Sequence, residues 1–315
     1  MSGGTGEFEL IARHFAPLAS PEGLALGDDA ALVPPPAGEA LAVTCDTMVS
    51  GIHFLPSDPP DSIGHKLLAV NLSDLAAMGA RPSHYLLATS WPEPPSEAWL
   101  AGFTAGLRRM QDAFGIGLVG GDTTRTPGPL TLTLTAFGAV EAGRALRRST
   151  ARPGDILFVS GTLGDAALGL RLGEEGPLRE RLLRPTPRVA LGRALLGLAT
   201  AAMDVSDGLL GDLAHIAEQS RVGAVVEAAR LPLSPAAAAV LSEDPSLFSL
   251  VLTGGDDYEL LFTAAPSNRE AVVAAAAAAD TPVTEIGIIR AEPGVVALDR
   301  DGHPLELETV GFRHF

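Results

Sequence analysis

The stretch LVGGDTTR, residues 118–125, combines a glycine pair with an aspartate, two threonines and an arginine, all of them residue types that bind phosphate or metal ions. A glycine pair after a strand often marks a phosphate site, yet the lysine of a P-loop does not follow it here. Five other acidic clusters lie beside Gly, Ser or Thr: GDDAA (27–31), TCDT (44–47), NLSD (71–74), MDVSDG (203–208) and GGDDYE (254–259). We expect these acids at strand ends or turns, where small neighbours leave room for a hydrated cation.

Clustered carboxylates of this kind favour Mg²⁺, which uses one or two carboxylates, water and substrate phosphates. Aspartates brought together from distant segments would also repel one another without counter-cations. Taken singly, each Asp-Gly pair is most often a turn or a helix cap, and Asp74 can simply face solvent on its helix. The six clusters together favour a metal-dependent site for a phosphorylated ligand.

Several other catalytic systems are excluded by missing motifs. The chain has no GxxxxGK[ST] sequence, and its single lysine, Lys66, is followed by Leu67. The HRD and DFG motifs of protein kinases are missing, and no HExxH or paired cysteine spacing favours zinc. Cys45 has no evident histidine partner, so we predict a buried strand thiol. The turn GTLGDAALG (161–169) is by itself a weak indication of a phosphate site.

Composition indicates a soluble globular protein that is long enough for two domains, with 315 residues of which 46% are hydrophobic and 19% charged. The formal charge of −16 argues against a partner nucleic acid, whose phosphates are bound by a surplus of Lys and Arg. The single cysteine rules out an internal disulfide and fits a reducing compartment. Because MSGGTGEFEL lacks a basic region and no segment has about 18 uninterrupted apolar residues, we expect a cytoplasmic protein without a membrane span.

Hydrophobic periodicity predicts alternating strands and helices. Strands are expected at 41–49, 83–91 and 129–140, the last alternating Thr with Leu, and helices at 63–80 and 96–115. A Pro-Gly turn, a strand, a glycine turn and a helix follow in 151–172; further helices are expected at 238–245 and 274–279, and strands in parts of 251–264. The fold class is therefore α/β (α+β) with two domains, a mixed-sheet N-terminal domain (1–147) and an α/β C-terminal domain (148–315).

These motifs, in this order and spacing, resemble the thiamine-monophosphate kinases, a family in the aminoimidazole ribonucleotide synthetase-like superfamily. The resemblance rests on GDDAA, CDTMVSGIHF, AVNLSDLAAMGA, GGDTTR, ALRRS, DVSDGL and GGDDYEL, and it runs from EFELIARHF to GFRHF. It implies ATP-dependent phosphorylation of thiamine phosphate to thiamine diphosphate by direct in-line transfer. It also implies a homodimer of two-domain subunits, with ATP, Mg²⁺ and dimerisation assigned to residues 1–147 and several Mg²⁺ ions bridging ATP to aspartates.

The resemblance also assigns site residues. The family's metal positions match Asp29, Thr44, Cys45, Asp46, Asp74, Asp122, Asp204 and Asp207. Its nucleotide contacts match Gly121, Asp122, Arg148 and Ser206, and its thiamine phosphate contacts match His53, Asp256 and Phe312. The residues expected to carry catalysis are Asp122, Asp46, Asp74 and Asp207. Cys45 replaces the hydroxyl residue often found there, which leaves its side chain or its backbone carbonyl as the ligand, and Asp256 is shorter than the family's frequent Glu.

Alternative functions stay open at this point. A selenophosphate synthetase-like activity is associated with a reactive Cys or selenocysteine and a Lys near the N-terminus, and the first 40 residues contain neither Cys nor Lys. A binding module that holds nucleotide without turnover would use the acidic clusters structurally. His53 can equally be a structural or surface histidine, and Phe312 an ordinary core aromatic.

Overall fold

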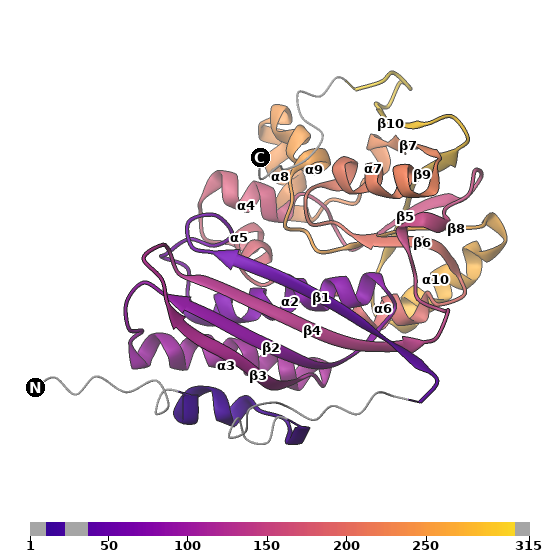
Figure 1. Ribbon diagram of the computed structural model, residues 1–315. Helices are drawn as coiled ribbons and strands as arrows, with labels where there is room; N and C mark the ends of the chain where they lie inside the picture. Colours follow the sequence, from indigo (N-terminus) through magenta and orange to yellow (C-terminus); the bar gives the residue numbers. More distant parts are fainter. Residues whose placement is uncertain (1–10, 23–36, 306–315) are drawn as a thin grey trace, which may run out of the picture. The chain divides into compact units, whose positions relative to one another are not determined.

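The computed structural model describes residues 11–22 and 37–305, which divide into two compact units (Figure 1). Unit 1 holds the described residues up to Leu75 together with Arg81–Ala142, and unit 2 holds Ala76–Ala80 and the described residues from Gly143 onward. The assignment of functions to residues 1–147 and 148–315 stays a prediction. No helix in the described ranges is long and apolar enough to cross a membrane.

The described strands of unit 1 form a four-stranded sheet in the order β1-β4-β2-β3. Its strands are β1 (Glu39–Val49), β2 (Arg81–Trp91), β3 (Gly117–Arg125) and β4 (Thr131–Glu141). Strand β4 pairs antiparallel with β1 and β2, whereas β2 and β3 are parallel. In β4, Leu132 and Leu134 are fully buried and the threonines between them are half-buried, which confirms the strand predicted from the Thr/Leu alternation.

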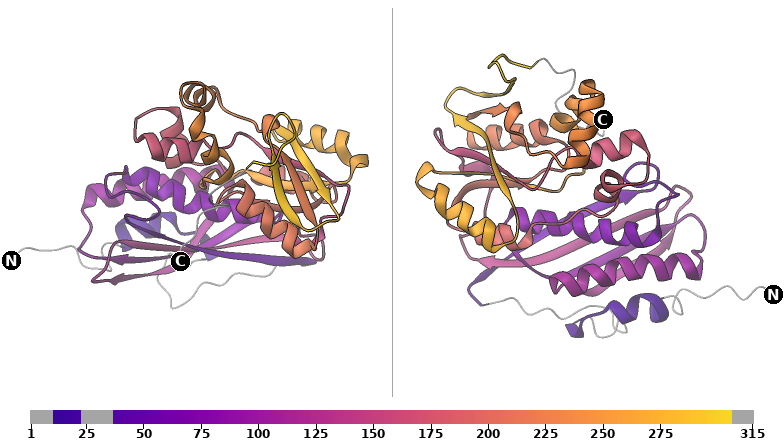
Figure 2. Two further views of the ribbon diagram at one scale, coloured as in Figure 1. Left: turned by 90° about the horizontal axis from the view of Figure 1, so that it is seen from above. Right: turned by 180° about the vertical axis from the view of Figure 1, so that it is seen from behind.

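Two helices, α2 (Pro60–Ala77) and α3 (Glu97–Phe114), cover one face of this sheet (Figure 2). Helix α3 begins where the Ser96 side chain accepts a hydrogen bond from the Trp99 amide, and it ends at Gly115 in the left-handed conformation. Within α3, Leu100, Phe103 and Leu107 recur at helical spacing and are buried. The helices predicted at 63–80 and 96–115 are confirmed.

The opposite face of the sheet, called the open face below, carries apolar side chains. Because alternate residues of a strand point to opposite sides, Leu41, Val43, Cys45 and Thr47 of β1 all lie on this face, and all are exposed. Leu41 and Val43 are 47% and 57% exposed, and Leu86 of β2 is 36% exposed. The prediction that Cys45 is buried is therefore wrong, because its strand position directs it away from the helices.

The described strands of unit 2 form a mixed six-stranded sheet in the order β10-β7-β9-β5-β8-β6, with β10 and β7 parallel and the other neighbours antiparallel. The strands are β5 (Ile156–Ser160), β6 (Ala199–Asp204), β7 (Gly223–Glu227), β8 (Leu260–Ala264), β9 (Val283–Arg290) and β10 (Gly294–Leu298). The helices are α4 (Asp165–Leu172), α5 (Pro177–Leu183), α6 (Val189–Ala194), α7 (Leu209–Ser220), α8 (Pro235–Glu243), α9 (Ser249–Thr253) and α10 (Arg269–Ala278).

The core of unit 2 includes the stacked rings of Phe158 and Phe262, which are register partners on β5 and β8 with centroids 5.2 Å apart. The strand and helix predicted within 151–172 are confirmed as β5 and α4, and the helices predicted at 238–245 and 274–279 fall in α8 and α10. Of residues 251–264, only the last five form a strand, because residues 251–253 belong to α9.

Candidate active site

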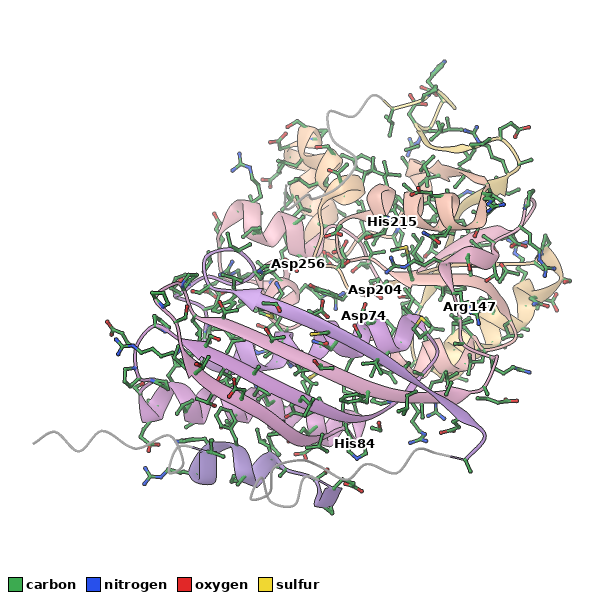
Figure 3. The ribbon with its side chains drawn as sticks, viewed as in Figure 1. Asp74, His84, Arg147, Asp204, His215 and Asp256 are labelled. Atoms are coloured by element: carbon green, nitrogen blue, oxygen red, sulfur yellow. The ribbon has the colours of Figure 1, made fainter. Side chains whose placement is uncertain are left out.

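Unit 1 brings two of the predicted metal ligands together. Asp46 lies in β1 on the face that α2 covers, and Asp74 (labelled in Figure 3) comes from α2. Burial, the neighbouring charge of Asp74 and the hydrogen bond between the two side chains together raise the pKa of Asp46 to about 7. Two neighbouring carboxylates repel each other when both are ionised, and a bound cation removes this repulsion.

The neighbours of Asp46 in β1 differ in the face they use. Thr44 shares the face of Asp46, and its hydroxyl donates a hydrogen bond to Asp74 Oδ2. The Cys45 side chain points to the open face, where its Sγ accepts a hydrogen bond from the Thr135 hydroxyl at 3.3 Å. A cation held by Asp46 and Asp74 would thus lie on the opposite side of the strand from this sulfur, which favours the backbone carbonyl of Cys45 as the ligand.

The structure of unit 1 does not place Asp122 beside this pair. In the sheet register, Asp46 is level with Leu134, Leu87 and Gly121, so Asp122 follows on the opposite face. Strands β1 and β3 are the two edges, which sets them three strand spacings, or roughly 14 Å, apart. Asp122 is exposed at that far edge.

The expectation that the acids of these clusters lie at strand ends or turns is wrong for three of them. Asp46 and Asp122 are inside strands, and Asp74 is inside a helix. The Gly120-Gly121 pair belongs to β3 rather than to a turn. A Cβ on Gly121 would lie 1.9 Å from the Leu87 carbonyl oxygen of β2. The parallel pairing of β2 and β3 itself therefore requires glycine at position 121.

His53 lies in the turn after β1, and its ring is oriented by the backbone. Its Nδ1 accepts a hydrogen bond from the Val49 amide at 3.0 Å, so the neutral imidazole carries its proton on Nε2. Lys66 of α2, the single lysine of the chain, donates from Nζ to the His53 carbonyl oxygen at 3.2 Å. The turn thus fixes Nε2–H of His53 as a hydrogen-bond donor.

Unit 2 joins two of the acidic clusters, residues 204–208 and 254–259. Asp204 ends β6, and the antiparallel pairing of β6 with β8 continues beyond the strands through backbone bonds from Val205 N to Glu259 O and from Tyr258 N to Val205 O, both 2.8 Å. A third bond runs from Asp256 N to Ser206 O at 2.9 Å. A residue predicted to contact nucleotide is in this way bonded directly to one predicted to contact thiamine phosphate.

The loop that carries Asp256, which is labelled in Figure 3, has an unusual backbone. Asp256 and Tyr258 have φ values of +69° and +51°, a region that residues other than glycine rarely adopt. The Tyr258 hydroxyl donates to Asp256 Oδ1 at 3.0 Å, and Asp256 is half-buried. Such strain persists where surrounding contacts impose it, which is common at functional sites.

The remaining predicted residues differ in how the structure places them. Ser206 and Asp207 are half-buried between β6 and α7. Arg148 begins the short helix η4 (Arg148–Thr150) with an exposed side chain, and its carbonyl oxygen accepts a 2.7 Å hydrogen bond from Ser220 of α7. Asp29 and Phe312 lie outside the described residues.

The acidic groups present fit Mg²⁺ better than a protein-enclosed metal. Among the described residues, no three His, Cys, Asp or Glu side chains gather closely enough to hold an ion. Two carboxylates, as Asp46 and Asp74 supply, with water and phosphate oxygens completing the shell, are the usual protein contribution to a Mg²⁺ site.

Sequence analysis missed a buried ionic cluster behind the 254–259 loop. Glu259 is fully buried and accepts hydrogen bonds from Arg188 at 2.5 and 2.7 Å, from Arg181 at 2.8 Å and from the Ser160 hydroxyl at 2.5 Å. Asp257, 2% exposed, accepts from the Gly164 amide at 2.9 and 3.1 Å, and burial raises its pKa well above the usual value. The sequence does contain a signal for this cluster: GGDDYE holds three acidic residues, of which the family resemblance assigns a role to Asp256 alone.

The Gly164 contact also explains the GTLGDAALG turn. Gly164 is the N-cap of α4, and its amide would face an anion at this helix start. The carboxylate of Asp257 already takes that place.

We expect the Asp46 carboxyl to make the metal-free protein less stable as pH rises. Its pKa in the folded state is about 7, above the ordinary 3.8, so the folded protein holds this proton more tightly than the unfolded chain. The contribution is fully present below about pH 4 and is lost as pH rises to about 7. Urea unfolding of the wild type and Asp46→Asn in EDTA should show the wild type losing stability relative to the variant across this window. A constant difference would contradict the raised pKa.

Comparison with known proteins places this geometry in a family. Residues 27–140 match the model of the AIR synthase related protein N-terminal domain, and residues 152–300 match the C-terminal domain of the same family. The thiamine-monophosphate kinase of Escherichia coli (strain K12) is 43% identical, with 98% of each sequence covered. The crystal structure of thiamine-monophosphate kinase from Stenotrophomonas maltophilia K279a has a TM-score of 0.82 and 50% identity, covering 89% of this chain and 91% of that one.

A further structure, AaThiL complexed with AMPPCP and TMP, has a TM-score of 0.79 and 33% identity, covering 98% of this chain and 97% of that one. Fold and family models thus define an AIR synthase-related protein of two α/β domains, which confirms the predicted fold class. The chain belongs to the thiamine-monophosphate kinase family. It is an enzyme of the phosphotransferase class.

Proposed function

We propose that this enzyme transfers the γ-phosphoryl group of ATP to thiamine phosphate, giving thiamine diphosphate and ADP, with the help of several Mg²⁺ ions. The observation that carries the proposal is the hydrogen bond from Asp256 N to Ser206 O, which joins the loop of a proposed acceptor contact to the loop of a proposed nucleotide contact. The complex of the related AaThiL with AMPPCP and TMP, an ATP analogue and the acceptor, supports the same pair of substrates.

The Mg²⁺ ions would be held by the acids of the clusters, with Asp46 and Asp74 as a pair in contact and Asp29, Asp122, Asp204 and Asp207 as further ligands. When bound, Mg²⁺ neutralises phosphate charge in the transition state of phosphoryl transfer. Thr44 and Cys45 would supply the remaining protein ligands through a hydroxyl and a backbone carbonyl.

The chain's own polar groups orient the two substrates for in-line attack. Arg148 and Ser206 face the nucleotide, and Gly121 permits the tight pairing that carries Asp122 on β3. His53 donates from Nε2–H to the acceptor phosphate. Asp256, oriented by Tyr258, accepts a hydrogen bond from the aminopyrimidine or pairs in charge with the cationic thiazolium. Since the attacking phosphate oxygen is already anionic near pH 7, no general base is needed.

The test is an assay of ADP release with thiamine phosphate, hydroxymethylpyrimidine phosphate or selenide as the second substrate. We expect turnover with thiamine phosphate alone, dependent on Mg²⁺ and abolished by excess EDTA. Turnover with selenide would assign a selenophosphate synthetase-like activity, and nucleotide binding without ADP release would assign a binding module. Full activity in EDTA would remove the metal from the mechanism.

We further propose that the enzyme is a cytoplasmic homodimer in which the open faces of two copies pack together. Exposed Leu41 and Val43 on β1 and Leu86 on β2 supply apolar contact area, and the family resemblance supports a second copy as its occupant.

A charge on the open face is expected to give a monomer. Val43→Asp puts an unpaired carboxylate into an apolar interface, whereas Val273→Asp makes the same change at a 52% exposed position on α10. Light scattering should report a dimer for the wild type and Val273→Asp and a monomer for Val43→Asp. A monomeric wild type, or a dimeric Val43→Asp, would contradict packing through this face.

The aromatic ring of Phe312 is expected to contribute to acceptor binding. Losing one aromatic contact forfeits on the order of 0.5–1.5 kcal/mol beyond area burial, so Phe312→Ala should raise KM for thiamine phosphate severalfold and leave KM for ATP nearly constant. Phe312→Trp should keep or modestly lower it. Steady-state kinetics with Phe315→Ala as the control checks this, and an unaltered KM in Phe312→Ala would make GFRHF a structural tail.

A further inference from the structure

Three consecutive amides of unit 2 converge on one carboxylate oxygen. Asp212 Oδ2 accepts hydrogen bonds from the backbone N–H groups of Ser206 at 3.0 Å, Asp207 at 3.1 Å and Gly208 at 3.1 Å. Asp212 is only 1% exposed, so these bonds are not shared with solvent. Burial raises the pKa of Asp212 to about 7, although the three amides act in the opposite direction.

The position of Asp212 in the sequence makes this contact possible. It lies in the first turn of α7, whose N-cap is Gly208, and its side chain reaches back over the start of the helix. Helix starts carry unpaired N–H groups and the positive end of the helix dipole, both of which favour a carboxylate. Here the amides belong to the segment that precedes the helix as well as to its cap.

The other side of this segment is held by the 254–259 loop. The Ser206 carbonyl oxygen accepts from Asp256 N at 2.9 Å, and a Cβ on Gly255 would lie 2.1 Å from the same oxygen. The amides of Ser206 and Asp207 are thus bound by Asp212, and the carbonyl of Ser206 by the loop. These contacts on both sides fix the backbone, and with it the direction in which the side chains of Ser206 and Asp207 point.

We propose that Asp212 is a positioning residue for phosphoryl transfer, which fixes the backbone of residues 206–208 so that Ser206 and Asp207 meet nucleotide and metal. The inference rests on the proposed function, since it assumes the roles given there to Ser206 and Asp207. Asp212 itself touches neither substrate nor ion. Residues that orient metal ligands in this way typically change metal affinity or activity by about 10–100-fold when replaced.

The role differs from plain helix stabilisation in what it predicts. A carboxylate that only stabilised α7 would alter the melting temperature and leave turnover per folded molecule unchanged. A positioning residue alters kcat and the Mg²⁺ concentration for half-maximal activity in fully folded enzyme. The effect of replacing such a residue also depends on whether the new side chain keeps an oxygen that can accept from the three amides.

The experiment compares Asp212→Ala and Asp212→Asn with Glu218→Ala and Glu218→Gln, which make matched changes at an exposed position of the same helix. Circular dichroism selects a temperature at which every variant assayed is folded, and ADP release at pH 8 then gives kcat, both KM values and the Mg²⁺ requirement. We expect Asp212→Ala to lower kcat about 10–100-fold and to raise the Mg²⁺ requirement, with a smaller change in KM for thiamine phosphate. Asp212→Asn, which keeps an acceptor oxygen, should recover part of the loss and remain about 3–10-fold impaired.

The two Glu218 variants should match the wild type. Wild-type kcat and Mg²⁺ requirement in folded Asp212→Ala would overturn the proposal, whatever happened to the melting temperature. If Asp212→Ala does not fold, Asp212→Asn decides alone, and an unaltered Mg²⁺ requirement in it overturns the proposal. A wild type inactive with thiamine phosphate would instead refute the proposed function, so the two failures are distinguishable.

Discussion

Replacing Asp74 by asparagine is expected to stabilise the metal-free protein at pH 8 and, at the same time, to lower ATP turnover by at least about a hundredfold. Asp74 is one of the causes that raise the pKa of Asp46, so removing its charge relieves a repulsion that exists only when both groups are ionised. The amide oxygen of asparagine can still accept from the Thr44 hydroxyl. The charge needed to hold Mg²⁺ is lost, and with it the turnover.

Thermal melts in EDTA at pH 5.5 and pH 8 measure the first effect and ADP release measures the second. The gain in melting temperature should vanish at pH 5.5, where Asp46 with its pKa of about 7 is already protonated. Asp112→Asn, at an exposed position of α3, serves as the control and should alter neither quantity. A variant that is both active and no more stable would show that Asp46 and Asp74 form no cation site.

The second large effect is expected at Glu259. Its carboxylate is fully buried and compensates Arg181 and Arg188, whose side chains are only 23% and 16% exposed. Glu259→Ala leaves these cations without their common partner, and breaking a buried pair from one side typically costs about 3–5 kcal/mol. We therefore expect a loss of this order in the free energy of unfolding of unit 2, measured by urea titration.

The control for Glu259 is a pair of the same chemistry at the surface. Glu180 is 58% exposed and accepts two hydrogen bonds from Arg184 at 2.7 and 2.9 Å. Exposed pairs contribute about 0–1 kcal/mol, so Glu180→Ala should be nearly neutral. Equal losses in both variants would mean that burial of the Glu259 cluster contributes nothing beyond the local contacts.

Local patterns in the sequence predicted the regular elements well. The Thr/Leu alternation of β4 and the apolar spacing of α3 depend on neighbours within a few residues, so the sequence alone predicts both elements. The two glycines of LVGGDTTR suggest a turn, because glycine more often marks a turn than a strand, but they lie inside β3. At position 121 glycine is required by the close approach of the β2 backbone, which depends on a distant part of the chain.

The candidate site shows the same limit. Six acidic clusters pointed to metal chemistry, and the structure pairs Asp46 with Asp74 and residue 206 with residue 256. Sequence spacing does not reveal that Cys45 faces away from Asp46 toward the open face. It also does not reveal that Asp212 accepts from the amides of residues 206–208, or that Glu259 pairs with Arg181 and Arg188. These facts follow from strand faces and tertiary contacts, which no local pattern encodes.

The Asp257 side chain occupies the start of α4, the place that a dissolved anion would otherwise take. This carboxyl group belongs to the same chain and is 2% exposed, so its contact with the Gly164 amide is intramolecular and closed to solvent. A free phosphate would have to displace the Asp257 side chain from the Gly164 amide. The start of α4 in the GTLGDAALG turn is therefore already filled by a side chain of the same protein.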